Sequence, residues 1–125
     1  MVGLLSYSRR DAAALPLSEA TVETVIARTR TAVLAQLLVA IGIVAGLLLA
    51  GRAASGTLAM LFYGLAALAM WGLLGAALST WDHFRTAAPL RAHLGLDLAR
   101  ESDPAKFWRA HRGLFPYFSL PPSQR

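Results

Sequence analysis

The chain has 125 residues, no cysteine and a net charge of +5, with 56% hydrophobic and only 15% charged residues. An ordinary soluble domain carries roughly 25% charged residues, so this composition favours a membrane protein. The absence of cysteine excludes disulfides, thiolate metal sites and a cysteine nucleophile within the chain. Since the positive charges flank apolar segments, we expect partners with acidic surfaces or anionic lipid headgroups rather than nucleic acid.

Residues 1–31 are predicted to form a cytoplasmic N-terminal segment with an amphipathic helix. Ser18 can cap the free backbone N–H groups of a helix, and Glu19 complements its positive dipole end. Val22, Val25 and Ile26 then recur at helical spacing on one face. A signal peptide fits poorly, because this segment is long and contains acids as well as bases.

Two apolar segments without charges follow, at residues 31–51 and 53–81. A bilayer core of ~30 Å needs about 20 apolar helical residues, so both are long enough to cross. We predict transmembrane helices at residues 32–50 and 57–79. The non-cytoplasmic turn at residues 51–56 is too short to recross the bilayer, and the two spans are therefore antiparallel.

Lysine and arginine are concentrated in the two flanks, whereas the turn holds only Arg52. The positive-inside rule predicts a multi-pass protein of the bacterial inner (cytoplasmic) membrane with both termini in the cytoplasm.

Residues 80–125 are predicted to form a cytoplasmic tail rich in basic and aromatic residues. Asp103 is a good N-cap and Pro104 fits the first helical turn, which predicts a short helix over residues 104–112 that stops at Gly113. Gly95 weakens the helical pattern of residues 90–98.

Small residues recur four apart in both spans, a spacing that allows a second helix to approach closely. The candidates for helix packing are Gly42, Gly46, Ala50, Gly72 and Ala76. They either pack the two spans together, which we favour, or face another subunit. For Gln36, the one strongly polar residue well inside the first span, we favour bonding to lipid carbonyls or water over a partner in another helix.

Neither predicted span contains Asp, Glu, Lys, Arg or His. Intramembrane ionisable residues usually mark ion coupling and proton relays, so this chain alone is not expected to carry out such transport or to ligate haem. His83, His93 and His111 lack metal-ligand spacing and are interpreted as interfacial or solvated. We expect no catalytic residue, no metal site and no cofactor, and the chain is not predicted to be an enzyme.

Aromatic and basic residues of the C-terminal flank are the predicted docking surface. Trp, Tyr and Arg are favoured anchors at protein interfaces, and the same residues suit a lipid headgroup layer; we favour a protein partner. The candidate residues are Trp81, Arg85, Phe107, Trp108, Arg109, Arg112, Phe115, Tyr117 and Phe118.

The sequence thus predicts an all-α membrane protein built as a two-span transmembrane helical hairpin, with an amphipathic N-terminal lead-in and a short cytoplasmic C-terminal helix. The favoured function is a non-catalytic accessory or assembly subunit of a multi-subunit bacterial membrane complex of the respiratory, photosynthetic or transporter type. Its expected partners are membrane lipids and other integral membrane subunits. Two alternatives stay open: a self-associating hairpin, holin-like or membrane-shaping, and a membrane anchor that contacts a cofactor in an enzyme complex.

Overall fold

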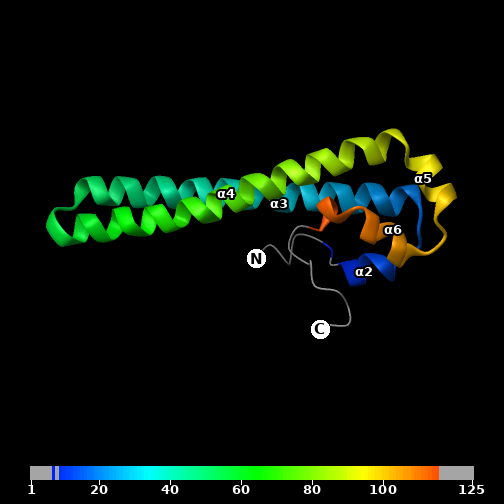
Figure 1. Ribbon diagram of the computed structural model, residues 1–125, viewed down its shortest axis with the longest axis horizontal. Helices are drawn as coiled ribbons and strands as arrows, with labels where there is room; N and C mark the ends of the chain where they lie inside the picture. Colours follow the sequence, from blue (N-terminus) through cyan, green and yellow to red (C-terminus); the bar gives the residue numbers. More distant parts are fainter. Residues whose placement is uncertain (1–6, 8, 116–125) are drawn as a thin grey trace. The chain divides into compact units, whose positions relative to one another are not determined.

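The computed structural model describes residue 7 and residues 9–115, and these are almost entirely helical (Figure 1). The elements in chain order are α2 (Arg9–Ala13), α3 (Glu19–Ala53), α4 (Gly56–Ala92), α5 (Leu94–Arg100), α6 (Pro104–Ala110) and the 3-10 turn η1 (Arg112–Leu114). The chain divides into two compact units. We call Leu34–Leu78 the hairpin unit, and Met1–Val33 together with Ser79–Arg125 the headpiece.

The hairpin unit consists of the second part of α3 and the first part of α4, joined by a tight turn. Only Ala54 and Ser55 lie outside the helices. Gly56 opens α4 with a φ of +63°, a left-handed conformation that glycine adopts without the steric cost a side chain would bring. Gly51 also has a packing reason, because a Cβ there would lie 2.9 Å from Cε1 of Tyr63. These two glycines allow the helices to reverse direction within two residues.

Both long helices extend beyond the spans that the sequence predicts. The first helix is continuous from Glu19, so the amphipathic lead-in and the apolar span belong to one helical element. The second continues past Ser79 and through Pro89 to Ala92. A proline inside a helix removes one backbone hydrogen bond, and here it does so close to the end of α4. Each helix also contains a window apolar and long enough to cross a membrane.

The N-terminal part of the headpiece begins as predicted. The backbone N–H of Thr21 donates to Oγ of Ser18 at 3.3 Å, which confirms Ser18 as the capping residue of α3. Ahead of it, the short helix α2 packs beside α6 from the other end of the chain. The two flanks of the hairpin therefore fold against each other.

The C-terminal part of the headpiece is more regular than predicted. Gly95 does not prevent a helix, since α5 spans Leu94–Arg100. Asp103 caps α6 through its Oδ1, which accepts from the N–H of Ala105 at 3.1 Å. The helix ends at Ala110, and the chain then tightens into η1 instead of stopping at a glycine C-cap.

The headpiece has its own hydrophobic core. Val22, Val25 and Ile26 on α3 contribute the apolar stripe that the sequence predicts, and Ala87 and Leu90 contribute from α4. The remaining buried members come from α2, α6 and the segment after it: Ala12, Phe107, Trp108, Leu114 and Phe115. Trp108 makes edge-to-face contacts with two phenylalanines, at ring-centroid distances of 5.0 Å and 5.5 Å, a geometry that adds to simple burial.

A buried hydrogen bond links the two ends of the headpiece. Oγ1 of Thr29, on α3, donates to the carbonyl oxygen of Leu114 at 2.8 Å, and both residues are completely inaccessible to solvent. A salt bridge between Arg91 and Glu23 (3.4 Å) also joins α4 to α3, but both side chains are over 40% exposed. Exposed pairs contribute little, so apolar packing and the Thr29 bond stabilise the headpiece.

Candidate functional site

The hairpin unit exposes most of its large apolar side chains. Leu38, Met60 and Trp71 are 70%, 75% and 75% exposed. Within this unit, the buried apolar side chains are Val44, Ala66 and Ala76. The two helices thus bury small residues against each other and present the large ones outward, which is the reverse of a water-soluble helical pair.

Of the five candidate packing residues, the structure places only Ala76 in a buried position, at 1% exposure. Ala50 is half-buried. A Cβ added at Gly42, Gly46 or Gly72 would meet no atom within 4 Å. The glycines of the G-x-x-x-G motif therefore do not mediate contact between the two spans, which was the role we favoured for such residues. In the hairpin unit, the glycine in close contact is Gly51, which is not among the candidates.

The exposed members of the predicted docking surface lie where α4 leaves the apolar segment. Trp81 is 71% exposed, and Arg85 follows it one helical turn later, also exposed. Phe84, between them in the sequence, is 45% exposed. Residues three and four apart share a helix face, so these three side chains form one surface strip, which we call the α4 belt.

The other aromatic candidates are used inside the chain. Phe107, Trp108 and Phe115 are 3%, 1% and 2% exposed and belong to the headpiece core. Arg109 is exposed on α6, where its Nε donates to the carbonyl of Ala105.

The last three docking candidates are covered only in part. Arg112 is described as the first backbone residue of η1. Tyr117 and Phe118 lie outside the described residues. Of the predicted docking residues, Trp81, Arg85 and Arg109 are therefore the ones that the structure shows exposed on the headpiece.

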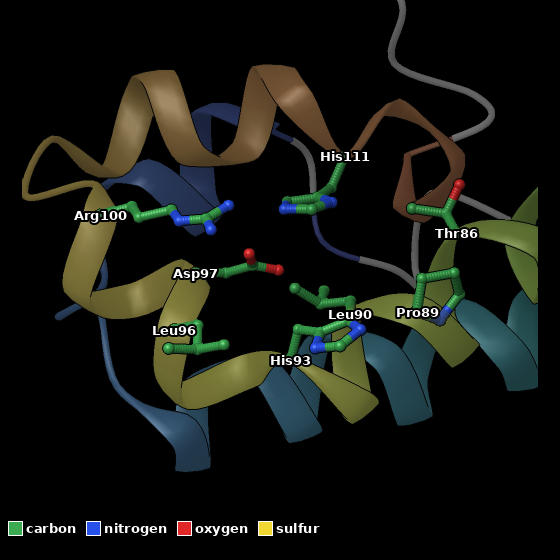
Figure 2. A pocket seen from close by; sticks show the side chains of 8 residues that line it. All are labelled: Thr86, Pro89, Leu90, His93, Leu96, Asp97, Arg100 and His111. Atoms are coloured by element: carbon green, nitrogen blue, oxygen red, sulfur yellow. The ribbon is translucent and has the colours of Figure 1, made fainter.

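A cavity of about 420 Å³ opens beside α5 in the headpiece (Figure 2). Its lining is Thr86, Pro89, Leu90, His93, Leu96, Asp97, Arg100 and His111. Figure 2 shows the side chains of Asp97, Arg100 and His111 pointing into the same space. Burial lowers the pKa of His111, and the nearby Asp97 carboxylate partly opposes that effect. No sequence pattern groups these lining residues, because they come from α4, from His93 between α4 and α5, from α5 and from the segment after α6.

The cavity contains two imidazoles and one carboxylate, a combination that invites comparison with a metal centre. Across residue 7 and residues 9–115, however, no three His, Asp or Glu side chains converge in a way that could hold a metal ion. The lining of this cavity contains no serine, cysteine or lysine, and its one hydroxyl belongs to Thr86. The lining instead combines polar side chains that can form hydrogen bonds, such as Asp97 and Arg100, with the apolar side chains of Leu90 and Leu96.

His83 differs from the predicted interfacial or solvated histidine. It is completely buried, and neither ring nitrogen has a hydrogen-bond partner in the described part of the chain. It lies two residues past Trp81, outside the apolar segment. Burial lowers the pKa of His83, and the positive charges of Arg30 and Arg91 lower it further; the backbone of Gly113 lies near enough to oppose this in part. The imidazole is therefore held neutral within the headpiece.

Comparison of the chain with protein-family models, with curated proteins and with solved structures gives no match.

Proposed function

We propose that the chain is a non-catalytic accessory subunit of a multi-subunit bacterial membrane complex, in which the hairpin unit anchors the headpiece to the membrane. The exposed apolar surface of the hairpin unit carries this proposal. In the most apolar windows of α3 and α4, only 17% and 6% of residues are buried, whereas a core helix of a soluble protein would be mostly buried. Contiguous apolar surface of this kind marks contact with lipid or with other proteins.

The headpiece supports a topology in which both flanks lie on the same side of the membrane. Residues before and after the hairpin build one core, and the bond from Thr29 to Leu114 joins them. The excess of Lys and Arg in these flanks favours the cytoplasmic side of the inner membrane. The α4 belt would then lie at the lipid–water boundary, where tryptophan and arginine are favoured.

Anchoring and topology can be tested with single-cysteine variants, because the native chain has no cysteine. Ser55→Cys lies in the hairpin turn and Ser102→Cys precedes α6, and both positions are exposed. We expect the protein to stay in the membrane pellet after alkaline carbonate extraction. An impermeant maleimide should label Ser55→Cys in spheroplasts, and Ser102→Cys only after lysis. Release by carbonate, or labelling of Ser102→Cys in spheroplasts, would overturn the anchoring or the orientation, respectively.

The accessory role is tested by isolating the tagged protein from its native membranes in mild detergent and identifying integral membrane proteins in stoichiometric amounts by mass spectrometry. We expect such partners to be retained by the native chain and depleted in a Trp81→Ala/Arg85→Ala variant of the α4 belt. Arg52→Ala, in the hairpin turn, is the matched control and should retain them. Isolation of the chain without any stoichiometric partner would refute the accessory role.

A further inference from the structure

The headpiece cavity beside α5 presents two opposite charges that the chain does not pair. The side chains of Asp97 and Arg100 both point into it (Figure 2). Among the described residues, neither the Asp97 carboxylate nor the Arg100 guanidinium forms a hydrogen bond or a salt bridge, with the other or with a third group. The volume of about 420 Å³ falls within the range of small-molecule sites, about 300–1,000 Å³.

Two imidazoles, those of His93 and His111, complete the polar lining together with the hydroxyl of Thr86. Burial lowers the pKa of His111 more than the Asp97 carboxylate raises it, so this imidazole is neutral at pH 7. The ring of Phe107 lies against it at a centroid distance of 4.9 Å and restricts its orientation. A neutral imidazole can donate one hydrogen bond and accept another, so His111 can bind a ligand of either charge.

The spacing of the two charges restricts the ligand that can satisfy both. Asp97 and Arg100 are three residues apart on α5, so they are neighbours on one helix face, with about 5–6 Å between their Cβ atoms. An anionic ligand that reaches Arg100 also approaches the Asp97 carboxylate, and a cationic ligand meets the converse repulsion. A ligand that carries an ammonium and a carboxylate within a few bonds of each other can pair with both side chains.

The rest of the lining is apolar. Leu90 is almost completely buried, whereas Leu96 is 60% exposed, and Pro89 lies beside them in the lining. A ligand that covers Leu96 removes apolar surface from water, which is favourable in proportion to the area covered. The uncharged part of the ligand is therefore expected to be apolar.

We propose that this cavity binds a free α-amino acid with an apolar side chain. The carboxylate of the ligand forms paired hydrogen bonds with the guanidinium of Arg100, its ammonium pairs with Asp97, and its side chain lies on Leu90 and Leu96. An α-amino acid carries both charges on one carbon, which suits two side chains one helical turn apart. The site lies within the headpiece, so it depends neither on the membrane topology nor on a partner subunit.

Isothermal titration calorimetry of the purified full chain in detergent tests the ligand class. L-leucine, L-methionine and L-phenylalanine are titrated in turn, followed by two analogues of the best binder: its amide, which has no carboxylate, and its deamino acid, which has no ammonium. We expect saturable one-to-one binding of the best amino acid, and binding of each analogue weaker by roughly ten- to hundredfold, the effect of losing one hydrogen bond to a charged group. Absence of saturable binding of all three amino acids in the millimolar range, or equal binding of an analogue, would overturn the proposal.

Three substitutions test the location of the site. Arg100→Gln and Asp97→Asn each remove one charge, and each should weaken binding of the best amino acid roughly ten- to hundredfold. Arg100→Gln should also bind the amino acid and its amide equally, a loss of selectivity that a merely structural effect would not produce. Arg109→Gln is the matched control, because Arg109 is exposed but does not line the cavity, and it should bind like the parent. Unchanged binding in Arg100→Gln or Asp97→Asn, or an equal loss in Arg109→Gln, would show that the amino acid binds elsewhere.

Discussion

Gly113 is the position where a single methyl group should most disturb the headpiece. A Cβ added there would lie 2.8 Å from Cβ of Thr86 and 2.5 Å from the carbonyl oxygen of Asp82, and would also overlap Oγ1 of Thr86. Carbon atoms pack best at about 3.5–4.0 Å. The hydroxyl can rotate away, but the helix backbone and the Thr86 Cβ cannot. Gly113→Ala must therefore push η1 off α4.

The cost of this displacement follows from what η1 holds in place. Overpacking a tight contact typically costs about 1–3 kcal/mol. The shift would also strain the buried hydrogen bond from Thr29 to the carbonyl of Leu114, which is worth about 0.5–1.5 kcal/mol. We expect a total loss of about 2–4 kcal/mol. Since 1 kcal/mol changes the Tm of a small domain by roughly 4–8 °C, the headpiece should melt at least about 8 °C lower.

The assay follows thermal unfolding by tryptophan fluorescence in detergent. Replacing Trp71 and Trp81 with Phe leaves Trp108 as the only tryptophan, and it reports on the headpiece core because it is buried there. Gly95→Ala is the matched control: its Cβ meets nothing within 4 Å, and alanine is the better helix former by about 1 kcal/mol, so its Tm should stay level or rise. If Gly113→Ala melted within about 2 °C of the parent, which corresponds to at most about 0.5 kcal/mol for a domain of this size, the argument from steric contact would be refuted.

Three further outcomes are expected. Thr29→Val leaves the buried carbonyl of Leu114 unpaired and should destabilise the headpiece by about 1–3 kcal/mol in thermal unfolding. Thr31→Val loses only an exposed hydrogen bond within its own helix and should have little effect. Equal effects of the two variants would contradict the hydrogen bond assigned to Thr29. Trp108→Ala should cost about 3–5 kcal/mol, and Trp81→Ala, at 71% exposure, under about 0.5 kcal/mol; similar losses would refute the assigned core. Folding lowers the pKa of His83, so the unfolded chain binds protons before the folded chain as the pH falls. The Tm should therefore be constant above about pH 6.5 and decrease below it. His83→Gln should flatten that decrease; an equally steep decrease in the variant would show that other groups cause it.

The helix starts were predictable because their signals are local. Ser18 and Asp103 each cap the backbone within a few residues, and no distant part of the chain is needed to read them. The apolar segments were equally clear, since two such segments without charges can form helices long enough to cross a bilayer.

The headpiece core was not predictable, because its members are distant in the sequence. Trp108 and Phe115 looked like exposed anchors of a polar tail, and nothing local shows that residues from α3 cover them. His83 was misread for the same reason: its polar neighbours suggested an interface, but a continuous α4 places it inside the headpiece. Gly113 has the local pattern of a helix C-cap, whereas the structure needs it for close packing against α4.

The bond between Thr29 and Leu114 joins residues 85 positions apart, and this separation constrains the order of folding. During synthesis the N-terminal flank emerges first, with Val22, Val25 and Ile26 uncovered. The aromatic residues that cover them are made only after both long helices. In the proposed membrane topology, the hairpin unit would therefore enter the membrane before the headpiece closes. During that interval the apolar stripe of α3 is uncovered, and it can bind a chaperone or the membrane surface.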